Sequence, residues 1–255
     1  MSPLSIPISA ETRAELVQSL QRGVLAGLAM LTLVLAPGVR SVHTGSAPHA
    51  SLLERSTGTA DFGPHQPSSD ARHVADWIAD SRDNGDAEFI ILDKRQATLY
   101  VFDAAARLRN ATPVLLGAAR GDDNVPGIGA RPIADVQPHE RTTPAGRFTA
   151  QRGRNTLGEN VVWVDYDNAV SMHRVRATEP SERRMERLAS KTIDDNRVSY
   201  GCINVPVAFY DAFVLPTTDA GRQPIVYVLP EERSVREQFG SYDVASRRGP
   251  RRRDT

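Results

Sequence analysis

Residues 199–204 read Ser-Tyr-Gly-Cys-Ile-Asn and contain Cys202, the only cysteine among 255 residues. His173 lies upstream and is the only histidine after His139. A thiol with a pKa near ~8.5 is mostly protonated at neutral pH, but a neighbouring imidazolium stabilises the reactive thiolate. The two residues therefore predict a cysteine nucleophile and its base. Gly201 has no Cβ, so the amides of Gly201 and Cys202 are candidates for holding a developing oxyanion.

Other chemistry for these residues is less well supported. A single free cysteine is often a small buried apolar residue, and that reading stays open. His139 is the rival base, but it follows a proline in a long polar loop. A metal site is not expected, because one cysteine and two histidines in this half of the chain have no recognisable zinc spacing. No serine has the flanking glycines of a hydrolase nucleophile elbow.

Short β-rich runs must position the thiol and the imidazole. Residues 89–93 (FIILD) and 97–103 (ATLYVFD) predict a hairpin. Asp167 and Asn168 predict a two-residue hairpin turn, which places His173 at the far end of a strand. Pro206 predicts the start of a short helix over 205–214, and the polar loop 121–142 is long enough to border a cleft. Further strands are expected at 113–116, 146–151, 160–166, 169–173 and 224–229.

His173 followed by SYGCIN, the opening hairpin, and the segment 143–148 (TPAGRF) together resemble the L,D-transpeptidase catalytic domain, or YkuD-like family. The hallmark of that family is a histidine followed by Ser/Thr-His-Gly-Cys-hydrophobic-Asn/Arg. The resemblance covers 88–230 and implies a mostly β fold, a compact β-sandwich with a few short helices. About 140 residues are enough for one such domain with its own core.

The resemblance implies acyl transfer on peptidoglycan stem peptides, through a thioester on Cys202 and without a cofactor. It also implies that carbapenems are covalent inhibitors. With water as acceptor the same site would be an L,D-carboxypeptidase or amidase, and a catalytically silent peptidoglycan-binding module is the alternative outside enzymes. Supporting roles are expected for Ser199 in orienting the site and for Tyr200, Asn204 and Arg174 in the substrate pocket, although Asn204 also suits a structural role in the turn.

Two features depart from the family pattern. Tyr200 stands where the family has its second histidine, and a tyrosine stays neutral near pH 7. The stretch between His173 and Cys202 is also longer than usual and contains an insertion within 179–198. Its helical pattern with mixed charges predicts either a solvated surface helix or a flap whose arginines contact peptide carboxylates.

The N-terminal region predicts export. Residues 24–39 (VLAGLAMLTLVLAPGV) are uncharged between Arg22 and Arg40, so 1–39 is expected to be a leader with a signal peptide or an inner-membrane anchor. The alternative is a buried core helix. The catalytic domain would then act in the periplasm. The formal net charge of zero gives no indication of nucleic-acid binding. A linker is expected at 40–70, an edge helix within 71–87, and a basic, disordered tail at 231–255.

Overall fold

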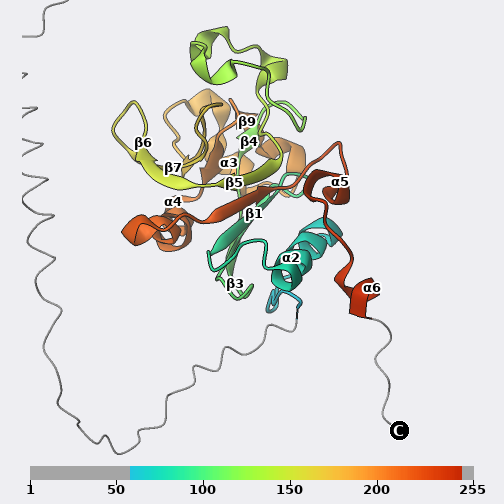
Figure 1. Ribbon diagram of the computed structural model, residues 1–255. Coiled ribbons are helices and arrows are strands. Elements are labelled where there is room, and N and C mark those ends of the chain that lie inside the picture. Colours follow the sequence, from blue (N-terminus) through green and yellow to red (C-terminus); the bar gives the residue numbers. More distant parts are fainter. Residues whose placement is uncertain (1–57, 249–255) are drawn as a thin grey trace, which may run out of the picture. The chain divides into compact units, whose positions relative to one another are not determined.

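The computed structural model describes residues 58–248. Its larger sheet has five strands in the order β3-β2-β1-β11-β5 (Figure 1). β1 and β2 form the antiparallel hairpin that the sequence predicts, whereas β11 runs parallel to β1. The strands are β1 (Phe89–Asp93), β2 (Thr98–Phe102), β3 (Leu108–Pro113), β5 (Gly146–Thr149) and β11 (Ile225–Val228).

A second sheet has four strands in the order β10-β8-β7-β6. β7 is antiparallel to both of its neighbours, and β10 is parallel to β8. Parallel neighbours need a crossover instead of a tight turn, and the chain between β8 and β10 includes the insertion. The strands are β6 (Gln151–Arg154), β7 (Asn160–Asp165), β8 (Val170–Arg174) and β10 (Ile203–Val205), and a separate parallel pair joins β4 (Leu116–Gly117) to β9 (Arg197–Ser199).

The main core lies between the two larger sheets. Ile90 and Leu92 of β1 face it from one side, and Val162 and Met172 face it from the other. All four side chains are fully buried. Alternate residues of each strand therefore point inward, as in a β-sandwich. The mostly β fold with short helices is confirmed.

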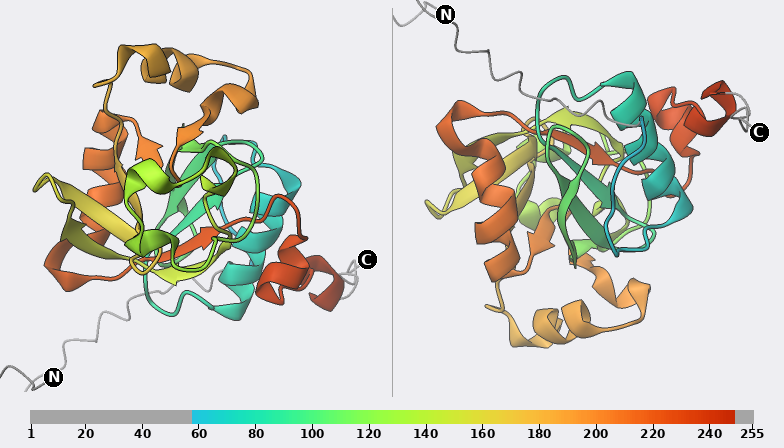
Figure 2. Two further views of the ribbon diagram at one scale, coloured as in Figure 1. Left: turned by 90° about the horizontal axis from the view of Figure 1, so that it is seen from above. Right: turned by 90° about the horizontal axis from the view of Figure 1, so that it is seen from below.

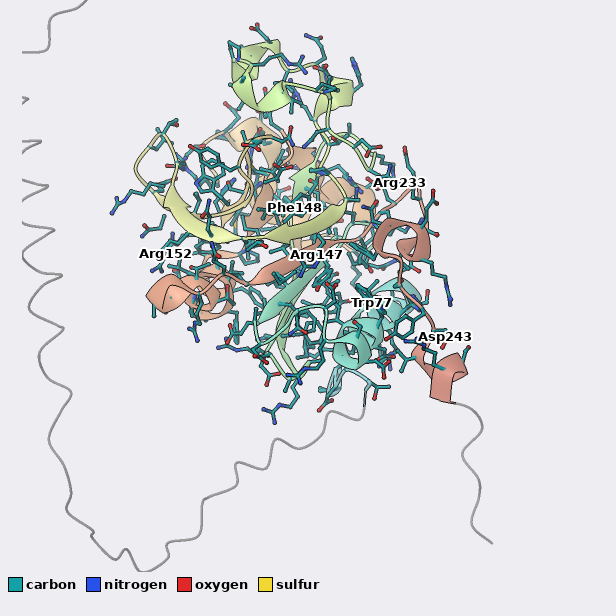
Figure 3. The ribbon with its side chains drawn as sticks, in the orientation of Figure 1. Trp77, Arg147, Phe148, Arg152, Arg233 and Asp243 are labelled. Atoms are coloured by element: carbon teal, nitrogen blue, oxygen red, sulfur yellow. The ribbon has the colours of Figure 1, made fainter. Side chains whose placement is uncertain are left out.

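The other face of the five-stranded sheet is covered by helix α2 (Ser69–Ser81), the expected edge helix. Ser68 caps it by accepting a hydrogen bond from the amide of Ala71 at 3.1 Å. Trp77 packs edge-on against Tyr227 of β11, with ring centroids 6.3 Å apart. Figure 3 shows the position of Trp77 on α2. Because both faces of β1 are covered, its five residues are all buried. This explains why FIILD is apolar apart from its last residue.

The remaining helices are short. α3 (Arg184–Ala189) lies in the insertion, between 3-10 turns at Pro180–Glu182 and Ile193–Asn196. Figure 2 shows this insertion projecting from the rest of the fold. α4 (Val207–Phe209) begins after Pro206 as expected and continues through a π-helical segment, Tyr210–Val214, into a 3-10 segment, Leu215–Gly221. The loop 121–142 contains three 3-10 turns at Ile128–Ala130, Ile133–Asp135 and Pro138–Glu140.

Several predicted boundaries are wrong. The third strand covers Leu108–Pro113 and not 113–116. The chain between β7 and β8 turns over four residues, 166–169, with Ala169 at φ 56°, where a two-residue turn was expected. Residues 231–248 are not a disordered tail, because they hold α5 (Val235–Phe239) and α6 (Val244–Arg248). Glu231 also has a side chain only 2% exposed.

Residues 1–57 and 249–255 lie outside the described part of the chain. They include the apolar run 24–39, most of the expected linker and the arginine-rich end. Within 58–248, no helix is long and apolar enough to span a bilayer.

Candidate active site

Pairing of β8 with β10 brings His173 and the segment after Cys202 side by side. Asn204 is the register partner of His173, and Ile203 is the partner of Met172. Met172 and Ile203 point into the core between the sheets. Because strand side chains alternate, His173 and Asn204 lie on the outer face. The sequence alone could not supply this parallel pairing.

Besides His173, two polar atoms lie close to the sulfur of Cys202. Its Sγ lies 3.7 Å from the hydroxyl of Ser171 and 3.5 Å from the carbonyl oxygen of Ala169. The cysteine is half-buried. Ser171 was not among the residues that the sequence suggested. Its position two residues before His173, on the same face of a strand, is the signal that could have identified it.

His173 is oriented by its own strand. Its Nδ1 lies 2.9 Å from the carbonyl oxygen of Arg174. A carbonyl only accepts hydrogen bonds, so Nδ1 carries the proton, and Nε2 is the basic nitrogen of the neutral ring. This tautomer suits a general base whose Nε2 receives the thiol proton.

The pKa values of the two groups are shifted toward each other. Burial by itself raises the pKa of the Cys202 thiol, but the hydrogen bond and charge of His173, together with hydrogen bonds from Ser171, hold it below its ordinary value. Burial lowers the pKa of His173, but the hydrogen bond and charge of Cys202 raise it above its ordinary value overall. These shifts favour a thiolate–imidazolium pair.

The segment before Cys202 is held by its own side chains. Ser199 Oγ donates to the carbonyl of Cys202 at 2.6 Å and accepts from the amide of Gly201 at 3.1 Å. The Gly201 amide is therefore occupied, and its predicted role as an oxyanion donor is wrong for this arrangement. Within the described chain, the Cys202 amide has no acceptor and remains the candidate donor. Ser199 orients the backbone of Cys202 and not its sulfur.

Gly201 is required by geometry. Its φ is 129°, a conformation that L side chains rarely adopt, and an added Cβ would lie 2.6 Å from the carbonyl oxygen of Thr142. The segment containing Thr142 and Thr143 thus packs directly against the residue before Cys202.

A buried lysine, Lys94, stabilises the contact between the Thr142–Thr143 segment and Gly201. The Nζ of Lys94 donates to the carbonyl of Thr143 and to Asp122 Oδ1, each at 2.9 Å, and lies 3.7 Å from Glu231. The hydroxyl of Thr143 donates to the carbonyl of Gly201 at 2.8 Å. Lys94 is fully buried. The TPAGRF segment, which reads as an ordinary turn, therefore links an internal ion-pair network to the segment that carries Cys202.

Asn204 is structural, as one reading of the sequence proposed, and it is not a pocket wall. It is fully buried, and its Nδ2 donates to the carbonyl of Cys202 at 3.2 Å. Its Oδ1 accepts from Arg184 of the insertion. Arg184 also pairs with Glu182, and Leu188 of the same helix is buried in a cluster with Leu115 and Val175. The insertion is therefore packed against the site and is more than a solvated helix.

Arg174 does not line the site, contrary to the sequence-based expectation. It pairs with Asp211 and lies over the ring of Tyr210, with 4.8 Å between Cζ and the ring centroid. As the neighbour of His173 in a strand, it points to the opposite face of the sheet.

Tyr200 and His139 are both at the surface. Tyr200 is 37% exposed, and the guanidinium of Arg141 lies over its ring at 3.9 Å from the centroid. His139 is exposed in the 3-10 turn Pro138–Glu140 and has no place in the Cys202 site.

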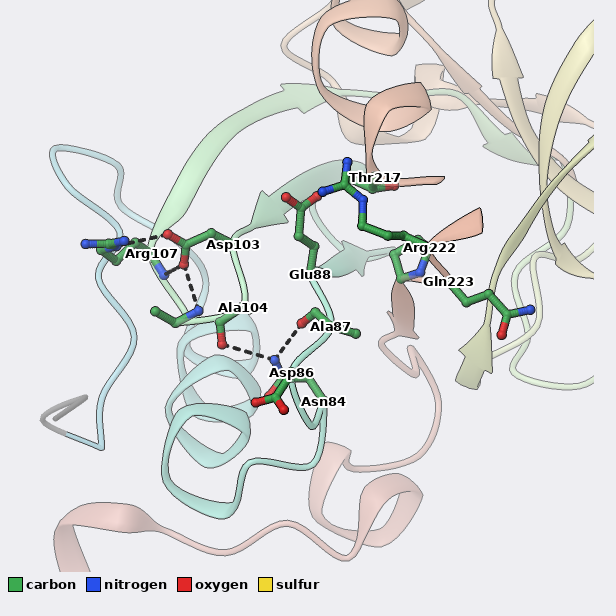
Figure 4. Close-up of a pocket in the computed structure, with 12 residues that line it drawn as sticks. Asn84, Asp86, Ala87, Glu88, Asp103, Ala104, Arg107, Thr217, Arg222 and Gln223 are labelled. Carbon is green, nitrogen blue, oxygen red and sulfur yellow. Dashed lines mark hydrogen bonds and ion pairs between the residues drawn. The ribbon is translucent and has the colours of Figure 1, made fainter. Parts of the chain in front are cut away.

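A separate hollow of about 610 Å³ lies beside the N-terminal ends of β1 and β11 (Figure 4). Its lining includes Glu88, Asp103 and Arg222, and no residue of the Cys202 site. The Nδ2 of Asn84 links two sides of this hollow by donating hydrogen bonds to the carbonyls of Ala87 and Ala104. No nucleophile–base pair lines it. Within 58–248, no group of three or more metal-ligating side chains is present.

Comparisons with known proteins give only distant structural similarity. No protein-family model and no curated protein matches the chain. The solved catalytic domain of the Enterococcus faecium L,D-transpeptidase is 16% identical over 56% of this chain and 98% of its own, with a TM-score of 0.32. A C442S mutant of that enzyme is 14% identical over 56% and 50%, with a TM-score of 0.32.

The helical cell shape determining protein Pgp2 from Campylobacter jejuni is 16% identical over 62% of this chain and 55% of its own, with a TM-score of 0.37. This chain thus spans about half the length of the longer of these solved proteins. Similarity at this level carries no conclusion about activity. Any function has to be supported by the residues of the site.

Proposed function

We propose that this protein is a cysteine-dependent L,D-transpeptidase acting on peptidoglycan stem peptides. One observation carries the proposal: the parallel pairing of β8 and β10 places His173 against the segment of Cys202 and shifts both pKa values toward an ion pair. These are the two residues on which the resemblance of the sequence to the L,D-transpeptidase family depends.

The proposed reaction begins with the Cys202 thiolate. It attacks the carbonyl that links an L-centred residue to a terminal D-alanine, and the Cys202 amide donates to the developing oxyanion. Imidazolium His173 then gives its Nε2 proton to the leaving amine, so that D-alanine departs and a thioester remains. An amine from a neighbouring stem attacks the thioester, and His173 takes up the proton that the amine loses. The thiolate is thereby regenerated.

The supporting residues hold this arrangement without joining the chemistry. Ser171 hydrogen-bonds to the sulfur and stabilises its anionic form. Ser199 and Asn204 both bind the carbonyl of Cys202 and fix the backbone of the nucleophile. A nucleophile held this way does not need to reorganise when charge develops.

Peptidoglycan as substrate requires the domain to act outside the cytoplasm. The proposal therefore includes export by residues 24–39, as a cleaved signal or an uncleaved anchor, and action in the periplasm. A reporter enzyme that is active only after export, fused behind residue 57, should be active. An inactive fusion would contradict this part of the proposal.

Incubation of the full chain with muropeptides tests the activity. Mass spectrometry should detect cross-linked products, loss of D-alanine and a thioester on Cys202. Cys202→Ala should abolish all three, and His173→Ala should lower the rate by at least ~10². His139→Ala is the matched control and should leave the rate unchanged. Products formed by hydrolysis alone would identify a carboxypeptidase instead.

A covalent inhibitor separates an active site from a silent binding module. Carbapenem incubation followed by intact-mass measurement should show one adduct, which is lost in Cys202→Ala. Absence of any adduct at millimolar carbapenem would contradict a working L,D-transpeptidase site.

A further inference from the structure

Arg141 is held flat on an aromatic ring beside the nucleophile segment. Its Cζ lies 3.9 Å from the centroid of the Tyr200 ring. Its Nε and Nη2 point to the carbonyl oxygen of Val136 at 3.4 and 3.3 Å. Ring stacking and these two contacts fix the plane of the guanidinium before any ligand arrives.

No carboxylate within residues 58–248 forms an ion pair with Arg141. The adjacent Glu140 is committed to Arg131, whose Nη1 and Nη2 both donate to it. Arg184, which contacts Asn204 in the site, pairs with Glu182, and Arg174 pairs with Asp211 on the opposite face of the sheet. A guanidinium has five N–H donors, and two nitrogens of Arg141 use one donor each, which leaves Nη1 free to bind an anion.

The position of Arg141 follows from the packing of its segment. The carbonyl of Thr142 lies against Gly201, and the hydroxyl of Thr143 bonds to the carbonyl of Gly201. Residues 141–143 therefore run alongside 199–201. The unpaired cation lies over the side chain that comes two residues before Cys202.

We propose that Arg141, stacked on Tyr200, binds a carboxylate of the substrate and orients it beside Cys202. The site itself is an anion site that can be tested without any peptide. The assignment of its ligand to the free carboxylate of a stem peptide rests on the proposed function. Tyr200 serves here as the platform for a permanent cation, whereas a histidine at that position would titrate near neutral pH.

Two small alkylating reagents test the anion site without assuming an activity. Iodoacetate and iodoacetamide both transfer a carbon to the Cys202 thiolate and release iodide, but only iodoacetate is charged. Their rates are compared at a pH at which the thiol is fully ionised. Arg141→Gln should lower the iodoacetate rate about 3- to 10-fold and leave the iodoacetamide rate unchanged. Arg154→Gln, in an exposed arginine at the end of β6, is the control and should change neither.

A stem tetrapeptide and its C-terminal amide test the identity of the ligand. The intact protein should prefer the acid by about 10- to 100-fold in kcat/KM, the usual scale for a charge-assisted hydrogen bond. Arg141→Gln should remove this preference by lowering turnover of the acid alone. Tyr200→Leu removes the platform and should reduce the preference in part, whereas Tyr200→Phe should retain it.

The outcomes separate the two proposals. A selective loss of iodoacetate reactivity with no turnover of any peptide supports the anion site and contradicts the peptidoglycan activity. Peptide turnover with equal losses for acid and amide in Arg141→Gln assigns Arg141 a structural role and overturns the carboxylate site. Unchanged reagent and peptide preferences in Arg141→Gln overturn it as well.

Discussion

Lys94→Met should be among the most destabilising single changes in the described domain. The Lys94 ammonium is fully buried and donates to Asp122 and to the carbonyl of Thr143, with Glu231 3.7 Å away. Without it, Glu231 keeps its ion pair with Arg197, but the buried carboxylate of Asp122 has no ion-pair partner left within the described residues. Removing one partner of a buried ion pair costs about 3–5 kcal/mol, because the other charge is left uncompensated. For a domain of this size that loss corresponds to a Tm lower by about 6–20 °C.

Urea and thermal unfolding of the full chain, monitored by circular dichroism, measure the loss. Lys191→Met is the matched control, since Lys191 is exposed and is the only other lysine in the chain. Adding Asp122→Asn to Lys94→Met should recover part of the stability by removing one unpaired charge. A loss below about 1 kcal/mol for Lys94→Met, or no difference from Lys191→Met, would refute the argument that this network holds the segment beneath Gly201.

Three further predictions follow from the same contacts. His173→Asn should move the midpoint of Cys202 alkylation by iodoacetamide to higher pH, because the imidazolium that lowers the thiol pKa is gone; an unmoved midpoint would show that the two groups are uncoupled. Gly201→Ala should lower the free energy of unfolding by about 1–3 kcal/mol in urea titrations. The φ of residue 201 is 129°, and an added Cβ would lie 2.6 Å from the carbonyl oxygen of Thr142. An unchanged free energy of unfolding would contradict this geometry. Burial raises the pKa of Asp122, but amide hydrogen bonds and Lys94 lower it overall to about 2. The stabilising contribution of Asp122 is therefore present above about pH 4 and is lost as the pH falls toward 2. The free energy of unfolding of Asp122→Asn should fall less steeply over that range in an acid titration, and equal slopes for the variant and the original protein would contradict this prediction.

The sequence determined the parts of this protein that depend on local pattern. Alternating and continuous apolar runs identified the hairpin of β1 and β2, the strands around His173, and β11. Pro206 marked the start of a helix, and the edge helix expected within 71–87 is α2, which buries Val74, Trp77 and Ile78. These elements could be predicted because strand and helix periodicity is set by residues a few positions apart. The types of residue also made Cys202 and His173 the candidates for nucleophile and base, since few side chains can serve in these roles.

Tertiary structure decided which residues surround Cys202. The parallel register of β8 with β10 brings Ser171 to the sulfur and turns Arg174 to the opposite face, although Arg174 is adjacent to His173 in the sequence. Lys94 and Thr143 support Gly201 from segments far away along the chain. Pairing between distant strands depends on the shape and burial of the whole core, and a local pattern does not contain that information.

The dependence on contacts between distant segments also explains why the sequence misassigned the residues after 230 and the role of the Gly201 amide. The chain after residue 230 is polar and looks like a tail, but Glu231 is held by Arg197, and the amides of Glu231, Glu232 and Arg233 donate to Asp122. The Gly201 amide looks free in the sequence, but Ser199 occupies it. The sequence by itself determined which residues are able to do the chemistry and which segments form strands. Only the folded chain decided which donors are already used and which charges remain unpaired, because hydrogen bonds and ion pairs are satisfied by whichever groups the fold brings within reach.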